Sequence, residues 1–289
     1  MRIIRRKKGN QTYIYLQHSF REQGKVKTVE RYLGKVEELS DKKIKIKIQG
    51  IVDEILKKSK DNYYKKLEEI KQKFQAEWKK IPESVKKKEL EEIAIAFTYN
   101  TNAIEGSSIT LEESREIIHD KISPNKSLKD VRETEAHSRI FLEILDKKQK
   151  TKNEILLRWH KEIFYETKPD MAGRYRDYLV RVGYYQAPDW QEVKKMMNEL
   201  INFIEKMRKM NPVELSARAH YKFEKIHPFG DGNGRIGRLL MNHLLWYSGY
   251  PMLIIEYKKR KAYYKALQKD EEGFVSYFIK KYLTVHKIR

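Results

Sequence analysis

The strongest constraint on this chain is a glycine-rich stretch of twelve residues, His227-Pro-Phe-Gly-Asp-Gly-Asn-Gly-Arg-Ile-Gly-Arg238. Gly230, Gly232 and Gly234 allow the backbone to turn its N–H groups inward and to approach an anion closely. A helix is predicted to begin at Arg235, and the free N–H groups at a helix N-terminus favour negative charge. The stretch therefore predicts a phosphate-binding loop between two helices.

The charged side chains of this stretch suit the same ligand. Arg235 and Arg238 are three residues apart, so on a helix both guanidinium groups lie on one face and can bind phosphate oxygens in a forked geometry. Asp231 is a hard oxygen ligand of the kind that Mg²⁺ uses beside phosphates. His227 can exchange a proton near neutral pH. The alternative is a plain glycine connector with a structural histidine, which does not need so many acidic, amide and basic groups.

The same stretch resembles the signature of the Fic family, His-Pro-Phe-x-Asp/Glu-Gly-Asn-Gly-Arg-x-x-Arg, in which every specified position is matched. The resemblance covers about residues 84–289 and implies a mainly α fold, a Fic-type helical bundle with a β-hairpin flap. It implies a protein adenylyltransferase that moves AMP from ATP to a Ser, Thr or Tyr hydroxyl of a target protein or of itself. A lysine in place of Gly234 would indicate the phosphotransferase branch of the family; UMP or GMP transfer stays open.

The resemblance also implies roles for the loop residues. His227 is expected to act as the general base, Asp231 to hold Mg²⁺, and Arg238 to position the γ-phosphate. The other positions expected to contact phosphate are Gly230, Gly232, Asn233, Gly234 and Arg235.

A second motif precedes the loop in the chain. Thr101-Asn-Ala-Ile-Glu105-Gly106 resembles the inhibitory motif of the same family, Ser/Thr-x-x-x-Glu-Gly/Asn. The resemblance implies that Thr101, Glu105 and Gly106 belong to an inhibitory helix, and that Glu105 pairs with Arg238 in place of the γ-phosphate. The alternative is an ordinary helix C-terminus with a glycine cap.

One segment interrupts the helical pattern, from Gly173 to Tyr185. Its alternating Tyr175, Tyr178, Val180 and Val182 predict a β-hairpin between helices. Its place before the loop resembles the Fic flap, so Tyr178, Val180 and Val182 are expected to bind a target segment by strand addition. A hairpin that merely covers the core is the alternative.

Helix start signals dominate the chain after residue 83. Capping-box spacings, in which Glu follows Thr or Asp by three residues, predict helix starts at Thr110, Thr151 and Asp189. Pro212 predicts a further helix that runs to about Ile226.

The first 80 residues predict two smaller parts. Residues 12–16 and 26–33 are rich in β-branched and aromatic residues and predict a hairpin, with a turn at Glu22-Gln-Gly24. Apolar residues at helical spacing over 41–80 predict one or two amphipathic helices, and Pro82 interrupts the pattern. The expected organisation is a small basic β-rich N-terminal module over 1–40, a helical linker over 41–83 and a Fic domain over 84–289.

Positive charge is concentrated near the start of the chain. The net charge is +21, and residues 1–80 hold 23 Lys/Arg against 11 Asp/Glu. Such a surface attracts nucleic acid by counterion release, although a heavily solvated Lys/Glu surface is an equal alternative. A second hypothesis is therefore a nucleic-acid-associated protein, binding through residues 1–80, whose Fic core senses a nucleotide. A third is a Fic enzyme that removes AMP.

Composition limits the setting of this activity. No stretch approaches the roughly 18–20 apolar residues needed to span a bilayer, so no membrane partner is expected. The chain has no cysteine, which excludes disulfides and thiol nucleophiles and suits a reducing cytoplasm. By resemblance, a homo-oligomer is a further expectation.

Overall fold

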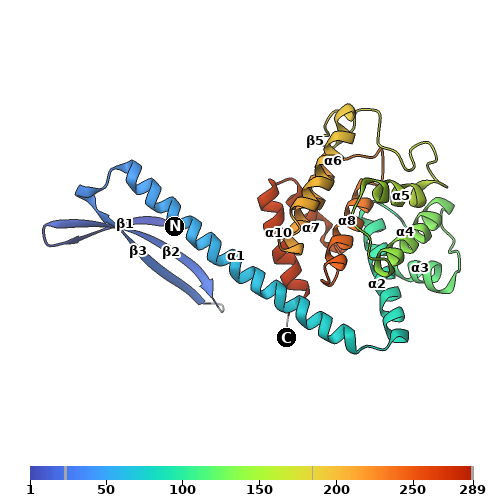
Figure 1. Cartoon of the computed structure of the whole chain (residues 1–289), viewed down its shortest axis with the longest axis horizontal. Helices are drawn as coiled ribbons and strands as arrows, with labels where there is room; N and C mark the ends of the chain where they lie inside the picture. Colours follow the sequence, from blue (N-terminus) through green and yellow to red (C-terminus); the bar gives the residue numbers. More distant parts are fainter. Residues whose placement is uncertain (23–24, 184, 288–289) are drawn as a thin grey trace. The chain divides into compact units, whose positions relative to one another are not determined.

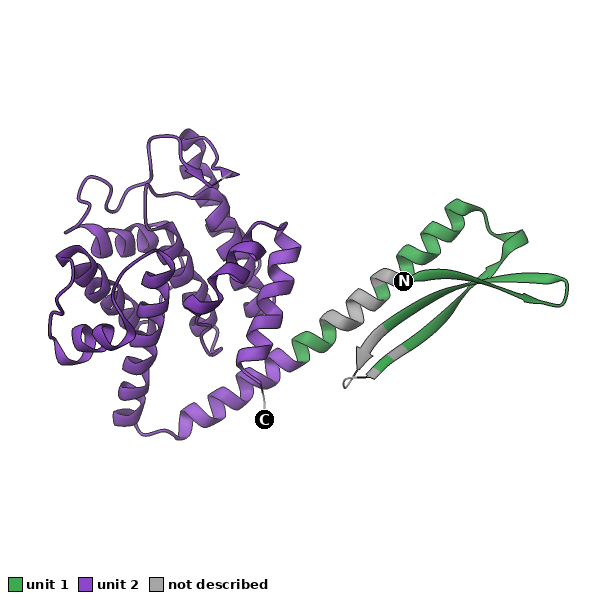
Figure 2. Cartoon of the chain, turned by 180° about the vertical axis from the view of Figure 1, so that it is seen from behind, with its two compact units in different colours: residues 1–65 green, residues 66–289 purple. Residues whose placement is uncertain are grey.

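The computed structural model describes residues 1–22, 25–183 and 185–287. The chain forms two compact units, Met1–Lys65 and Lys66–Arg289 (Figure 2). The division of the chain into 1–40, 41–83 and 84–289 stays a prediction. The turn expected at residues 22–24 falls largely outside the described residues.

The first unit contains a three-stranded antiparallel sheet of order β1-β2-β3 (Figure 1). Its strands are β1 (Arg2–Lys8), β2 (Gln11–Glu22) and β3 (Lys25–Lys35). The predicted hairpin is present as the antiparallel pair β2 and β3, but the third strand, β1, was not expected. Five of the seven residues of β1 are Arg or Lys, which hides the alternation that identifies a strand.

One face of this sheet packs against α1 (Asp41–Lys80), a single continuous helix. Ile14, Leu16 and Leu33 are buried on that face. The half-buried residues that cover them are Leu39, Ile44, Ile48 and Ile51. A short sheet needs such a cover because two or three strands alone are marginally stable.

The second unit is a helical bundle, which confirms the mainly α fold class. Its helices are α2 (Glu83–Ile104), α3 (Leu111–Arg115), α4 (Leu128–Asp146), α5 (Asn153–Phe164), α6 (Trp190–Lys206), α7 (Pro212–Ile226), α8 (Asn233–Tyr247), α9 (Arg260–Leu267) and α10 (Glu271–Val285). A π-helical turn, Glu116–Asp120, follows α3. Two short strands, β4 (Arg181–Val182) and β5 (Tyr185–Gln186), lie between α5 and α6 (Figure 1).

Helix α8 lies at the centre of the bundle. Twelve of its fifteen residues are buried, including polar Asn233, Arg235 and Arg238 at its N-terminal end. Around it pack aromatic side chains of four other helices: Phe97, Phe141, Trp159 and Phe223. The bundle therefore holds the N-terminus of α8 in a fixed, water-poor place.

The helix start signals were partly right. Thr110 forms the reciprocal capping box with Glu113, and Asp189 caps α6 by accepting from the Gln191 N–H. Thr151 does not cap α5, because that helix begins at Asn153 and leaves Glu154 one position too early for a capping box. Helix α8 begins at Asn233, two residues before the predicted start, since left-handed Gly232 serves as its N-cap.

Within the described part of the chain, no helix has both the length and the apolar character required to cross a bilayer.

The stacked pair Phe97–Phe141 provides a test of the core. Both rings are at most 1% exposed, and their centroids lie 4.2 Å apart. We expect Phe141→Ala to lower the free energy of unfolding of the bundle by about 3–5 kcal/mol, because it removes the ring and leaves a cavity. Phe141→Leu retains most of the volume and should cost clearly less. Denaturant titration followed by tryptophan fluorescence measures both; equal losses would contradict the cavity argument.

Candidate active site

The loop between α7 and α8 has a tightly specified backbone. His227 ends α7 in the left-handed conformation (φ 51°, ψ 60°), and its N–H donates to the Phe223 carbonyl at 2.9 Å. A non-glycine residue with positive φ is uncommon and persists where the surroundings determine it. Gly232 also has positive φ (78°), and a Cβ there would collide with the Phe164 ring. The glycine is required both for the turn and for this close approach.

Asn233 closes the loop with its side chain. Its Oδ1 accepts the Phe229 N–H at 2.8 Å, and its Nδ2 donates to the Phe229 carbonyl at 2.8 Å. Phe229 itself is buried and stacks on the His160 ring, 3.9 Å between centroids. The oxygen and the nitrogen of the Asn233 side-chain amide therefore both shape the loop, while the backbone N–H and the second Nδ2 proton are the groups of this residue that could contact an anion.

His160, on α5, anchors the loop from outside and was not expected from the sequence. Its Nδ1 accepts the Gly173 N–H at 2.9 Å, so its Nε2 carries the proton and donates to the Asp231 carbonyl at 3.0 Å. Burial lowers the pKa of His160 to about 4, which keeps this neutral form at pH 7. A lone histidine within a helical pattern gives no signal of such a task.

Arg176 joins the flap segment to the loop and was also missed. Its guanidinium is almost fully buried and donates to the carbonyls of His227 (2.9 Å), Tyr178 (2.9 Å) and Pro188 (2.6 Å). Its own N–H donates to the Pro228 carbonyl at 2.9 Å. These bonds hold the carbonyl side of His227 against the start of the flap.

The flap is shorter than predicted. Among the described residues of this segment, the strands are Arg181–Val182 and Tyr185–Gln186, while Tyr178 lies before them. The alternation that began at Tyr175 was misleading, because Tyr175 is half-buried beside Phe229 and Arg176 bonds to loop carbonyls instead of a ladder. Tyr178 and Val182 are 43% and 45% exposed and Val180 is half-buried, so the first two side chains are accessible to a partner.

Four charges form a chain across the loop. Asp231 Oδ2 lies 2.6 Å from Lys168 Nζ, which lies 3.1 Å from Glu133 Oε1, and Glu133 pairs in turn with Arg235. Burial raises the pKa of Asp231, but Lys168 and Arg235 outweigh it and leave that pKa below its usual value. Arg235 is thus oriented by Glu133, a residue that no sequence pattern indicated.

Arg238 is the most deeply buried cation of the site, 1% exposed. Its Nε donates to Thr101 Oγ1 at 3.0 Å, and its Nη2 donates to the Thr101 carbonyl at 3.1 Å and to Glu105 Oε1 at 2.7 Å. The structure therefore brings Thr101 and Glu105 to Arg238. Gly106, with φ 92°, follows Glu105 at the end of α2. The glycine at the helix C-terminus and the Glu105–Arg238 ion pair are therefore both present.

A second carboxylate lies behind this pair. Burial, opposed by Arg238 and reinforced by Glu105, raises the pKa of Glu224 to about 7. Nearby, His220 Nε2 and the Tyr263 hydroxyl lie 2.7 Å apart. The groups on this side of Arg238 are thus polar yet buried, where charge interactions are strong, whereas Glu105 lies on the solvent side.

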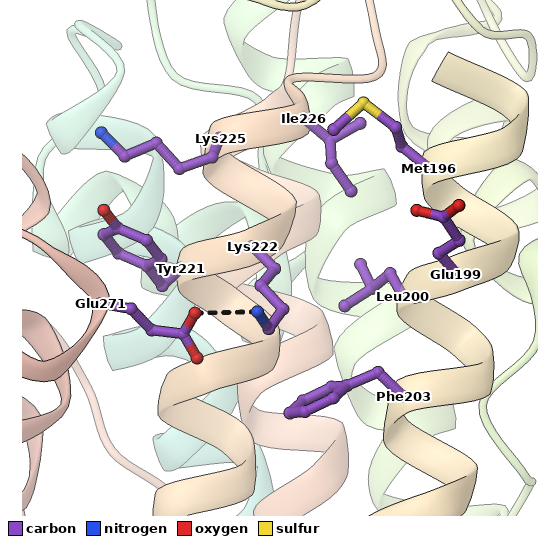
Figure 3. Close-up of a pocket in the computed structure, with 9 residues that line it drawn as sticks. All are labelled: Met196, Glu199, Leu200, Phe203, Tyr221, Lys222, Lys225, Ile226 and Glu271. Carbon is purple, nitrogen blue, oxygen red and sulfur yellow. Dashed lines mark hydrogen bonds and ion pairs between the residues drawn. The ribbon is translucent and has the colours of Figure 1, made fainter. Parts of the chain in front are cut away.

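A groove of about 410 Å³ lies between α6 and α7 (Figure 3). Its lining combines apolar side chains with Lys222, which pairs with Glu271 at 2.8 Å. Tyr185 of β5 donates its hydroxyl proton to the Lys225 carbonyl at 2.8 Å, so the flap ends beside the groove. The lining residues are Met196, Glu199, Leu200, Phe203, Tyr221, Lys222, Lys225, Ile226 and Glu271.

Residues 150–245 match the family model described as Fic/DOC family. The chain belongs to the Fic/DOC family. It is 32% identical over 201 residues to the protein adenylyltransferase Fic of Nematostella vectensis, and 33% identical over 196 residues to that of Culex quinquefasciatus. These alignments cover 67% and 65% of this chain but 47% and 39% of the relatives, so the chain matches less than half of their length.

Solved structures of Fic proteins share the fold. Fic-1 from C. elegans has a TM-score of 0.71 with 24% identity, covering 86% of this chain and 76% of that chain. A Fic family protein from Desulfovibrio desulfuricans has a TM-score of 0.65 with 25% identity, covering 79% and 75%.

The buried histidine at the loop generates a pH prediction. The pKa of His160 is about 4 in the folded protein and about 6.5 when unfolded, so between these values the unfolded chain binds one more proton. The free energy of unfolding therefore decreases as the pH is lowered below about 6.5. This residue contributes up to about 1.4 kcal/mol per pH unit to the decrease.

Denaturant titrations at several pH values test this effect through the slope. His160→Gln should flatten the fall between pH 6.5 and 4, whatever its effect at neutral pH. The control is His119→Gln, because His119 is exposed and paired with Glu91. An unchanged slope in His160→Gln would contradict the assignment.

Proposed function

We propose that the chain is a protein adenylyltransferase that transfers AMP from ATP to a hydroxyl side chain of a target protein or of itself. The observation that carries this proposal is the convergence of His227, Arg235 and Arg238 at the buried N-terminus of α8. A helix N-terminus with two arginines suits phosphate groups, and the histidine stands where a proton has to leave. The similarity to proteins named adenylyltransferase supports the same conclusion.

His227 is suited to act as the base. Burial, assisted by Arg176, lowers its pKa below the ordinary value, so the imidazole is neutral at pH 7 and can accept a proton. The target hydroxyl oxygen forms a bond to the α-phosphorus of ATP while the bond to the pyrophosphate oxygen breaks. The hydroxyl proton passes to His227, and pyrophosphate leaves. Positioning and charge stabilisation provide most of what such a transfer requires.

Asp231 fits the Mg²⁺ that ATP chemistry implies. Its carboxylate is a hard ligand with 48% of the side chain exposed, and Mg²⁺ beside phosphates commonly uses only one or two carboxylates. Among the described residues no cluster of three or more potential protein ligands exists, so phosphate oxygens and water would complete the shell. Bound Mg²⁺ would neutralise phosphate charge. Lys168, which now pairs with Asp231, would have to share or yield that carboxylate.

Glu105 is proposed as an internal inhibitor. It occupies the exposed side of Arg238, where the γ-phosphate would otherwise bind, and both are anions that the same guanidinium can accept. At Gly234, a Cβ would strike the Glu105 carboxylate, so Glu105 lies directly over the glycine loop. ATP and the Glu105–Arg238 pair therefore compete.

The target is proposed to bind along the flap and the adjoining groove. Tyr178 and Val182 are exposed, and strand addition at β4 would align a target segment next to His227. A different base on the nucleotide is an outcome of the labelling assay below, and AMP removal stays an alternative prediction from the sequence. A cytoplasmic location and a homo-oligomer stay predictions from the sequence.

The first test uses ATP labelled at the α-phosphate, with Mg²⁺, gel separation and autoradiography. Glu105→Gly should raise labelling of protein about tenfold or more, because a charge-assisted hydrogen bond contributes about 1.5–3 kcal/mol. Adding His227→Ala to that variant should lower labelling by about 10²–10⁴-fold, the usual contribution of a general base.

Glu83→Gly is the matched control, since Glu83 lies at the other end of α2 and is paired with Lys86 at 2.6 Å. It should label as the wild type does. If Glu83→Gly activates as strongly as Glu105→Gly, loosening of α2 rather than release of Arg238 is the cause. Absence of label from any α-labelled nucleotide in Glu105→Gly would reject the transferase proposal.

A further inference from the structure

The sheet of the first unit has a second face, opposite the one that packs on α1. Directly paired residues share a face, so Tyr15 lies between Ile4 and Tyr32, and Tyr13 lies opposite Arg6. The buried residues Ile14, Leu16 and Leu33 point the other way. The tyrosines are therefore not part of the core that holds the sheet to the helix.

Three tyrosine rings gather on this second face. The Tyr32 ring lies 5.5 Å from that of Tyr15 and 6.1 Å from that of Tyr13, and the Tyr32 residue is 54% exposed. Arg6 lies over the Tyr15 ring, with Cζ 5.7 Å from its centroid. Tyr13 and Tyr15 are half-buried. A partly exposed aromatic cluster with an arginine above it is a surface on which another flat, π-bonded group can stack.

The surroundings of the rings are basic and polar. By register Arg2 and Lys8 share the face, and among its described residues Glu30 is the acidic one, paired with Arg6 at 2.7 Å. Next to the rings a hollow of about 480 Å³ is lined by Met1, Arg2, Gln17, Ser19 and Thr28. Its hydroxyl and amide groups can hydrogen-bond to base edges or phosphate.

We propose that this face of the first unit binds single-stranded nucleic acid. Bases stack on Tyr13, Tyr15 and Tyr32, while Arg2, Arg6 and Lys8 contact phosphates. Stacking requires bases whose faces are free, which a duplex does not offer, and an acidic peptide would use the cations but not the rings. Single-stranded RNA and DNA share this chemistry. The proposal is independent of the transferase chemistry, because it uses no residue of the α7–α8 loop.

Fluorescence anisotropy with the full chain tests the proposal. The probes are fluorescein-labelled oligouridine and oligothymidine of about 12 nucleotides, and a duplex of the same length. Both single strands should bind more tightly than the duplex, and affinity should fall between about 50 mM and 200 mM salt. Comparison of the affinities for oligouridine and oligothymidine shows whether this face prefers RNA or DNA.

Tyr32→Ala isolates the stacking contribution. Loss of one base–aromatic contact should weaken single-strand binding about fivefold or more, whereas Tyr32→Phe retains the ring and should bind within about twofold of the wild type. Tyr247→Ala is the control, because Tyr247 is 43% exposed and lies in the other unit.

Arg6→Gln isolates the phosphate contribution. It should reduce the slope of log affinity against log salt by about 0.7, the value for one single-strand phosphate contact. Arg208→Gln is its match, an exposed arginine of the other unit that also pairs with one glutamate, Glu205.

Four outcomes would overturn the proposal: no binding at low salt, equal or tighter binding of the duplex, unchanged binding by Tyr32→Ala, or displacement of the oligonucleotide by polyglutamate at equal charge concentration. The last would indicate an acidic protein partner. Circular dichroism of each variant shows whether it is folded. If Tyr32→Ala is not folded, the salt dependence of Arg6→Gln and the comparison of single strands with the duplex decide the question.

Discussion

The buried guanidinium of Arg238 is the constraint on which the rest of the site depends. A cation that is 1% exposed needs an anion and hydrogen-bond acceptors, since the desolvation penalty of an unpaired buried charge is several kcal/mol. Thr101 and Glu105 meet that need in this structure, and ATP would meet it with a phosphate. The same physical requirement therefore explains both the proposed activity and its proposed inhibition. In the proposed exchange a phosphate of ATP would replace Glu105, because Arg238 needs an anion in either state.

Fixed surroundings make this exchange specific. The loop is attached to α5 through His160, to the flap through Arg176, and to α4 through Arg235 and Glu133. Each attachment uses a buried polar group whose partner is a backbone carbonyl or an opposite charge, so none can move without leaving an unsatisfied group. The N–H groups of the loop are consequently oriented before any ligand arrives, which is the arrangement that electrostatic catalysis requires.

The sequence predicted what is local and missed what is long-range. The loop and the helix from Pro212 to Ile226 follow from residue types at short spacing. The structure pairs Glu105 with Arg238, the contact that the resemblance implied, and adds a bond from Arg238 to Thr101 that was not expected. No sequence pattern indicates Lys168, Glu133 or Arg176. Each of them positions the loop only through contacts with residues that are distant in the chain. Strand β1 and the short flap were mispredicted for a related reason. The alternation of apolar and polar residues and the charge of a segment indicate which side chains are exposed, whereas the formation of a strand also depends on a neighbouring strand with which it can pair.

The two units depend on different interactions. In the bundle, apolar packing around α8 and buried ion pairs position one anion site. In the first unit, a small apolar face on α1 is enough to hold the sheet, so the opposite face is free to carry tyrosine and arginine. These rings contribute no packing against the helix, and the part of their apolar surface that is left in water costs about 25 cal/mol per Å². Because Tyr13, Tyr15 and Tyr32 meet each other rather than the helix, a ligand with its own flat faces would recover that energy, and a purely electrostatic partner would not.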